Sequence, residues 1–490
     1  MIRKIPLSLT GALAAALAAT ALAACTMEPD YQRPAPPVPA LDGGTGSSAA
    51  ADIGWREFFP DPQLQQLIVI ALADNRDLRV AALNVQSAQA QYRIQRADLF
   101  PTISATGSED VQRYPGSVLA AQSGGAAGAT PGGAIVRTYD VGIGFTSYEL
   151  DLFGRIRSLD HAALQTYFRY QETQRSTQLS LVAEVAAAYL AVLTDQTLLD
   201  LTAQTLKSQS DSLDLTQKLF DHGATTQLAL RQAETTVDTA QANLAQYTRQ
   251  LAQDRDALQL LLGAPIPNGI DFSGGLDRGA VVAELEEGIP SDVLVRRPDV
   301  LAAEHQLLSA NANIGAARAA FFPSVTLTGS YGTASSQLSG LFKGGSEAWT
   351  FNPAITVPIF TAGSNLANLD LSKLQRDTNV AQYEKAIQTA FREVQDALVA
   401  RGTLNQQLAA QQALVEASAD AYRLADIRFK GGVDNYLSAL DAQRSLYSAQ
   451  QSLQELRLTR LQNLVTLYKA LGGGLAEYSA PPSAAAGGGS

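Results

Sequence analysis

Two very long stretches of the chain combine an apolar stripe of helical period with an absence of helix breakers. Residues 155–219 contain neither Pro nor Gly, and residues 364–430 contain no Pro and a single Gly, Gly402. Apolar residues recur at steps of three and four: Val182, Val185, Tyr189 and Leu193 in the first stretch, and Val380, Tyr383, Ile387, Phe391, Val394 and Leu398 in the second. This pattern predicts two long helices with coiled-coil-like seams.

A glycine-containing turn follows each long stretch, at residues 220–225 and 429–434. Gly in a left-handed conformation commonly terminates a helix. Returning helices are therefore expected at about 225–262 and 434–471. They are too short to retrace the long helices, so we expect shorter helices to stack end to end on them and complete a wall.

Alternating apolar residues predict a pair of strands after each of two shorter helices, at 61–99 and 292–320. Pro101 and Pro323 should stop these helices. The alternating runs contain Ile103, Ala105 and Gly107, then Tyr139, Val141, Ile143 and Phe145, and in the second half Val325, Leu327 and Gly329, then Phe351, Ile355, Val357 and Ile359. Each run is about 10 to 12 residues long, as expected of a tilted strand that crosses a membrane.

This order of elements occurs twice because the chain contains an internal duplication. Residues 78–108 match residues 300–330 without a gap, with identities such as Pro101 and Pro323. A second match joins the two hairpins and pairs Gly223 with Gly432. A repeat of this length indicates one structural unit used twice, which suits a wall or a tube better than an enzyme pocket.

The N-terminus has the pattern of a targeting signal. Arg3 and Lys4 precede an Ala-rich apolar stretch that closes with Leu22-Ala23-Ala24-Cys25. Cys25 is the only Cys of the chain, and its position resembles the lipobox of bacterial lipoproteins. Thr26, which follows it, favours the outer membrane over the inner one by lipoprotein sorting rules. The alternative is an ordinary signal peptide with a chance Cys.

The chain is acidic, with a formal net charge of −11, and loss of a signal with two basic residues makes it more negative. This charge argues against a nucleic-acid partner. We find no apolar run near the roughly 20 residues of a membrane helix after the signal, so a membrane-crossing chain would need strands closed into a barrel. Because the smallest such barrels use about eight strands, four per chain require oligomers, and three copies would supply twelve.

The predicted organisation has six parts. They are a signal peptide at 1–24, a lipid-anchored tether at 25–60, a first repeat at 61–263, a crossover at 264–291, a second repeat at 292–474 and a disordered tail at 475–490. Trp55, Phe58 and Phe59 should anchor the tether on the folded body. The expected fold class is α+β and mostly helical.

Two blocks of sequence resemble the outer-membrane efflux lipoproteins of the TolC superfamily. They are Leu294-Val295-Arg296-Arg297-Pro298-Asp299-Val300 with Ala303-Glu304 and Ile314-Gly315-Ala316-Ala317-Arg318-Ala319-Ala320-Phe321-Phe322-Pro323, and Gly432-Val433-Asp434-Asn435-Tyr436-Leu437 leading into Leu440-Asp441-Ala442-Gln443-Arg444-Ser445-Leu446. The resemblance covers about residues 25–474. It implies a homotrimer with a 12-stranded outer-membrane β-barrel and a periplasmic α-barrel.

The resemblance also implies the partners of the chain. The tunnel would dock, through a periplasmic adaptor, with an inner-membrane pump, commonly of the resistance-nodulation-division class. Small molecules such as drugs would leave passively, and the pump would supply the energy. No cofactor is implied beyond the covalent lipid on Cys25, which would anchor the chain in outer-membrane lipid.

The resemblance places a periplasmic gate at Leu437, Asp441 and Arg444. These residues lie four and three positions apart and share one helix face. The first repeat has Leu228, Gln232 and Thr235 at the matching positions, so it lacks the charges. The alternative is a solvated ion pair worth about 0.3 to 0.5 kcal/mol.

The hairpin tips are the candidate docking points for the adaptor. The residues in question are Phe220, Gly223 and Ala224 in the first tip, and Phe429, Gly431, Gly432 and Val433 in the second. The alternative is that they only turn the chain.

The sequence gives no indication of an enzyme. The chain has three His residues, none in a metal-ligand spacing, and it lacks a nucleophile elbow, a P-loop and a complete dinucleotide fingerprint. Three other classes stay open: a duct for type I protein secretion, a periplasmic adaptor, and a structural coiled-coil lipoprotein. Two hairpins and two strand pairs argue against the adaptor, and strands of membrane-crossing length argue against the structural protein.

Overall fold

The computed structural model describes residues 26–39, 53–115, 133–282 and 292–479. The chain divides into two compact units. Unit 1 comprises Met1–Arg33, Gln86–Phe168 and His305–Ala381, and unit 2 comprises Pro34–Val85, Arg169–Glu304 and Gln382–Ser490. Both repeats contribute to each unit.

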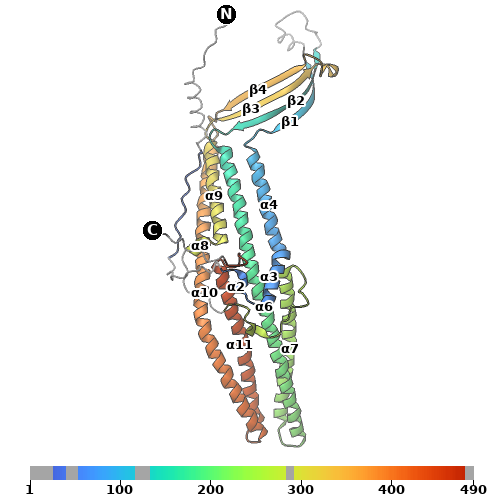
Figure 1. Cartoon of the computed structure of the whole chain (residues 1–490), viewed down its shortest axis with the longest axis vertical. Coiled ribbons are helices and arrows are strands. Elements are labelled where there is room, and N and C mark those ends of the chain that lie inside the picture. Colours follow the sequence, from blue (N-terminus) through green and yellow to red (C-terminus); the bar gives the residue numbers. More distant parts are fainter. Residues whose placement is uncertain (1–25, 40–52, 116–132, 283–291, 480–490) are drawn as a thin grey trace, which may run out of the picture. The chain divides into compact units, whose positions relative to one another are not determined.

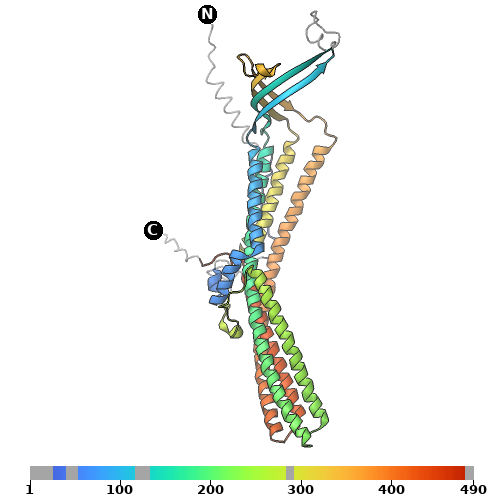
Figure 2. The same cartoon turned by 90° about the vertical axis from the view of Figure 1, so that its right-hand side faces the viewer.

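Unit 1 contains one antiparallel sheet of four strands in the order β1-β2-β3-β4 (Figures 1 and 2). The strands are β1 (Ile103–Tyr114), β2 (Ala134–Leu150), β3 (Ser324–Ser335) and β4 (Glu347–Thr356). β2 has 17 residues, more than expected, because a bulge between Phe145 and Tyr148 lets it continue. The expectation that the last run would extend to Val357 and Ile359 is wrong, since β4 ends at Thr356.

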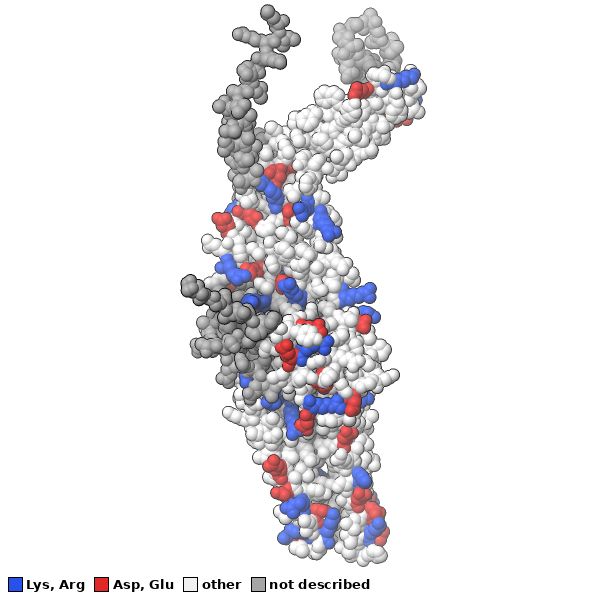
Figure 3. All heavy atoms as spheres, in the orientation of Figure 1, with Lys and Arg blue, Asp and Glu red and all other residues white. Residues whose placement is uncertain are grey.

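The register of the sheet separates an apolar face from a polar one. Residues paired across neighbouring strands share a face, and Ile143 pairs with Ala105 and with Tyr331, which pairs with Trp349. Exposed apolar side chains on this face are Ile103, Val111, Ile135, Val141, Ile143, Tyr331, Trp349, Phe351 and Ile355. Ser, Thr, Gly and Ala dominate the opposite face. On the side drawn in Figure 3, charged groups over the sheet gather at its outer end.

The long helices form as expected. α6 (Arg155–Asp221) and α10 (Ser364–Lys430) each have 67 residues, and the returning helices are α7 (Gln227–Leu262) and α11 (Tyr436–Ala470). One apolar stretch was overlooked in the sequence: α6 contains an 18-residue window apolar enough to cross a membrane. Because 56% of that window is buried inside the protein, it also fits a core helix.

The single helix expected at 61–99 is wrong, because the chain breaks at Asn75 into α3 (Pro62–Asp74) and α4 (Arg76–Ala97). The backbone of Asn75 is extended, with ψ of 132°. Its side-chain oxygen accepts from the amide of Leu78 at 2.8 Å, and its side-chain amide donates to the carbonyl of Leu261 at 2.8 Å. Asn75 therefore caps α4 and holds the end of α7 at the same time. The single helix expected at 292–320 is also wrong, because the chain forms α8 (Asp292–Val295) and α9 (Pro298–Ala319) there; α9 ends before Pro323, as expected.

Aromatic side chains anchor the segment around α2 (Trp55–Phe58) in unit 2. Trp55, Phe58 and Phe59 are at most 2% exposed, and the ring of Phe58 stacks on Tyr468 with centroids 3.9 Å apart. The expected disorder from residue 475 onward is wrong for 475–479, because the amide of Trp55 donates to the carbonyl of Ala476 at 3.0 Å. Residues 480–490 lie outside the described part of the chain.

Arg297, from the Arg-Arg-Pro-Asp block, holds three segments of unit 2 together. Its side chain is 8% exposed and donates to Asp299 at 3.0 and 2.7 Å, to Glu393 of α10 at 2.8 Å and to the carbonyl of Ala470 at 3.0 Å. The planar guanidinium suits these several acceptors. The block is therefore a structural clamp.

We predict that Arg297→Ala destabilises unit 2 by about 1–3 kcal/mol, because it removes the hydrogen bonds of a buried guanidinium while the two carboxylates left behind can reach water. Thermal unfolding measured side by side with Arg296→Ala, which changes the exposed neighbour, provides the check. Equal melting temperatures for the two variants would contradict the clamp.

Two carboxyl groups meet between α6 and α7. Asp195 is 8% exposed, so its carboxyl group is largely shielded from water. Asp254 accepts a hydrogen bond from Gln250 at 3.1 Å through Oδ1. Burial is the main cause, and a hydrogen bond with the carboxyl of Asp254 the second, of a pKa of Asp195 that is raised to about 7. The pair therefore holds a proton that the unfolded chain would release near pH 4.

Since the folded state binds this extra proton, the stability of unit 2 should fall as the pH rises from about 4 to about 7. Asp195→Asn, which keeps the shape and removes the proton, should flatten this fall and raise the melting temperature above neutral pH. Asp256→Asn, at an exposed site on α7, serves as the control. Parallel pH profiles for wild type and Asp195→Asn would count against the shared proton.

Candidate functional site

The two hairpin tips have the same turn geometry. In the first, the amide of Ala224 donates to the carbonyl of Leu219 at 2.7 Å, and in the second, Val433 donates to Arg428 at 2.9 Å. Gly223 and Gly432 have φ of 71° and 70°, respectively. A Cβ on either would meet nothing within 4 Å, so the left-handed backbone alone requires glycine.

The predicted docking residues differ in exposure. Gly223, Ala224, Gly431, Gly432 and Val433 are exposed, with Val433 at 67%. The two phenylalanines, Phe220 and Phe429, are half-buried.

Phe429 packs inward, against a cluster formed by Ala233, Tyr436 and Leu440, with its ring centroid 5.3 Å from that of Tyr436. The cluster also contacts Leu213 of α6, so it joins the two hairpins near their ends. Phe429 thus has a packing role, and the exposed surface of the second tip is mainly Gly431, Gly432 and Val433.

An ion pair closes the second tip and was missed in the sequence. Arg428 donates to the carboxylate of Asp434 at 2.5 and 3.0 Å. The hydrogen bond with Arg428 lowers the pKa of Asp434, and the same bond raises the pKa of Arg428. The first tip has Leu219 and Thr225 at the matching positions. The sequence contains a pattern that could have predicted this ion pair, because an Arg and an Asp flank the turn in the second repeat only.

The predicted gate residues form an exposed stripe on α11. Leu437 is 42% exposed, and Asp441 and Arg444 are also exposed. The residues that precede each of them along the chain, Tyr436, Leu440 and Gln443, are buried and face the first hairpin, where Gln443 donates to the hydroxyl of Ser208 at 3.2 Å. One face of α11 is therefore fixed by packing, and the adjacent face presents the gate residues.

Among the described ion pairs, none joins Asp441 to Arg444, so the solvated intrahelical pair considered above is not formed. In the first repeat, Leu228 is 67% exposed and Gln232 is half-buried. The gate itself stays a prediction, as does docking at the tips.

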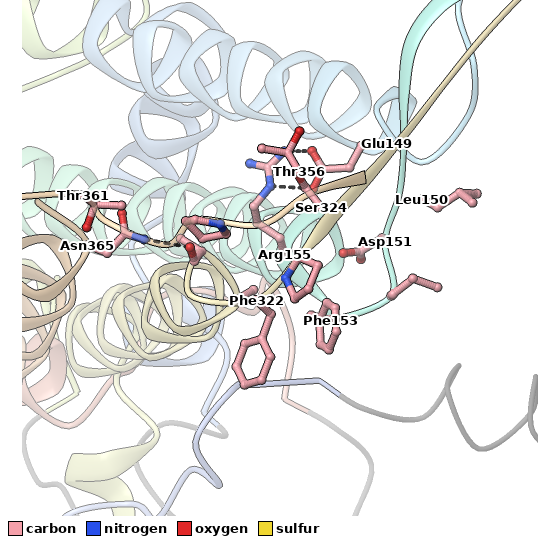
Figure 4. Close-up of a pocket in the computed structure, with 15 residues that line it drawn as sticks. Glu149, Leu150, Asp151, Phe153, Arg155, Phe322, Ser324, Thr356, Thr361 and Asn365 are labelled. Carbon is pink, nitrogen blue, oxygen red and sulfur yellow. Dashed lines mark hydrogen bonds and ion pairs between the residues drawn. The ribbon is translucent and has the colours of Figure 1, made fainter. Parts of the chain in front are cut away.

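A hollow of about 300 Å³ lies in unit 1 where the strands meet the helices (Figure 4). Arg155 at its wall donates to both carboxylate oxygens of Glu149, at 2.9 and 2.6 Å. Asp151 accepts from the amides of Ile156 and Arg157 at 3.1 and 2.9 Å and so caps α6. The ion pair between Arg155 and Glu149 and the helix cap from Asp151 together fix the turn from β2 into α6.

The described residues include no group of three or more His, Cys, Asp or Glu side chains placed to hold a metal ion. Cys25, the predicted lipidation site, and the signal peptide at 1–24 lie outside the described residues.

The chain belongs to the outer membrane efflux protein family, whose model matches residues 67–264 and 289–473. The predicted resemblance is thereby confirmed, and so is the location in the outer membrane. The two matched segments correspond to the two halves of the duplication.

Similar proteins include a toluene efflux pump outer membrane protein, TtgC, of Pseudomonas putida. It is 50% identical over 475 residues, which cover 95% of this chain and 96% of the relative. The outer membrane protein OprJ of Pseudomonas aeruginosa is 44% identical, and the match covers 94% of this chain and 95% of OprJ. The open-state structure of the Neisseria gonorrhoeae MtrE outer membrane channel is 41% identical, with a TM-score of 0.83, and covers 93% of this chain and 100% of MtrE.

Proposed function

We propose that three copies of this chain form the passive outer-membrane exit duct of a tripartite efflux pump that expels small organic molecules. An inner-membrane pump would supply the energy, and a periplasmic adaptor would contact the tips of the hairpins. A lipid on Cys25 would add an anchor in the outer membrane. Relatives named for the efflux of toluene and of antibiotics support this substrate class.

The observation that carries the proposal is the open four-stranded sheet. In the part of the chain that the structure describes, β1 and β4 each have one unpaired edge, and one face of the sheet is apolar and exposed. Lipid would cover that face, but free backbone groups at an edge are too costly in lipid. Pairing β1 of one copy with β4 of the next removes both edges, and three copies supply enough strands for a barrel.

Exposed apolar side chains on the helices also indicate contacts with other protein chains. On α10 they are Leu366, Leu371, Leu374, Val399, Leu414, Leu424 and Ile427, and on α4 they are Val80, Leu83 and Ile94. Single exposed apolar residues are ordinary, but repeated ones along one helix indicate a protein contact. A second and third copy would cover them.

We expect purified full-length protein to have the mass of a trimer in detergent and to conduct ions across a planar bilayer. Deletion of the gene should also raise the cellular accumulation of a small efflux dye without reducing the secretion of proteins. A monomer that passes no current would contradict the duct. Lost protein secretion with unchanged dye accumulation would favour the type I secretion alternative.

Asp441 and Arg444 are exposed and unpaired with each other in one chain, so in the trimer they are free to pair with a neighbouring chain. We predict that Asp441→Ala loosens the periplasmic end and raises single-channel conductance severalfold. Gln232→Ala, at the matching position of the first repeat, is the control and should conduct as the wild type does. Unchanged conductance of Asp441→Ala would count against the gate.

A further inference from the structure

The N-terminal segment that follows Cys25 is held against two helices of unit 1. The carbonyl of Met27 accepts from Arg318 of α9 at 3.2 Å, and the carbonyl of Pro29 accepts from the side-chain amide of Asn311 at 2.8 Å. Between them, the carboxylate of Glu28 lies 2.8 Å from Nδ1 of His161 on α6. Three consecutive residues thus each contact a different side chain of the groove between α6 and α9.

Gly315 makes room for this segment. A Cβ on Gly315 would lie 2.9 Å from the backbone nitrogen and from the Cα atom of Glu28, and 2.5 Å from the hydroxyl of Ser158. Gly within a helix costs about 1 kcal/mol relative to Ala, so its presence here needs a reason. In the first repeat, Arg93 occupies the matching position. The first repeat thus lacks the glycine that makes room for a chain segment in the second.

His161 connects the segment to a row of hydrogen bonds. Its Nε2 atom lies 2.9 Å from the side-chain amide nitrogen of Gln165, whose oxygen lies 2.8 Å from Nδ1 of His305 on α9. The charged groups around the ring are Glu28 from the segment, Asp160 from α6 and, beyond Asp160, Arg96 from α4. The hydrogen bond with Glu28 raises the pKa of His161, and the charges of Glu28 and Asp160 add to this effect.

We propose that the groove between α6 and α9 is a seat for the chain's own N-terminal segment, and that the contact between His161 and Glu28 grips the segment in a proton-dependent way. The segment next to the predicted lipid is then fixed on the folded body. The proposal is independent of the efflux function, because it concerns only contacts within one chain.

The direction of the pH dependence follows from the charge on the ring. A protonated ring sets a full positive charge against the carboxylate of Glu28, whereas the neutral ring offers that carboxylate only an N–H donor, so protonation of His161 strengthens the contact. Since the pKa is raised in the folded chain, this contribution is complete below about pH 6.5 and is lost as the pH rises through the raised value. The carbonyl contacts of Asn311 and Arg318 do not depend on this proton.

The test places a nitroxide label on Asp30→Cys in the full-length, acylated protein and measures the mobility of the label. Asp30 is exposed within the segment, and the parent protein without the added Cys shows whether Cys25 itself takes up label. We expect a restrained spectrum at about pH 6 and a larger mobile fraction at about pH 9, where a histidine is neutral. Gly315→Ala should be mobile at both pH values.

Gly402→Ala is the matched control, because a Cβ at this helical glycine of α10 would meet nothing within 4 Å. It should leave the spectrum restrained. His161→Gln should abolish the pH response. Glu28→Gln should abolish it as well, and because this variant alters only the segment, it remains a test if Gly315→Ala fails to fold. A restrained spectrum in Gly315→Ala would overturn the seat. A pH response that survives in both His161→Gln and Glu28→Gln would overturn the grip.

Discussion

The open edges of a four-stranded sheet are the constraint on which the rest of the structure depends. Each edge carries backbone donors and acceptors that no other strand among the described residues pairs with. In water such an edge is a hazard, and in lipid it costs several kcal/mol for each unsatisfied group. The apolar face around Ile143 and Trp349 favours lipid, so the sheet needs neighbouring copies of itself. The proposed trimer supplies them.

The duplication gives the chain two similar halves, and a few residue differences between them give the halves different structural and predicted functional roles. Gly223 and Gly432 turn both hairpins in the same way. Only the second hairpin has the Arg428–Asp434 pair and the exposed charges of the predicted gate. Only the second repeat has Gly315, against which the N-terminal segment lies. A barrel built from identical repeats would lack these differences, so the second half of the chain carries most of the predicted regulation.

Much of the fold was predictable because its signals are local. Long stretches with no Pro and at most one Gly predicted α6 and α10, and prolines after α4 and α9 marked where the strands begin. The break at Asn75 was missed because it depends on a distant contact with Leu261. The pairing of residues 475–479 with α2 was missed for the same reason, since small residues at a chain end resemble disorder. For the candidate site, helical spacing predicted the shared face of Leu437, Asp441 and Arg444, but not the packing of Phe429.

Pairing between β1 of one copy and β4 of the next is the central claim, and disulfide cross-linking tests it most directly. Cys pairs would be scanned at polar-face positions, starting with Thr106→Cys on β1 and Asn352→Cys on β4, and the oxidised protein would be run on a denaturing gel. The account predicts covalent dimers and a closed species of three chains, which require both substitutions in the same chain. If the gel shows only the monomer band for every Cys pair in the scan, the account is contradicted.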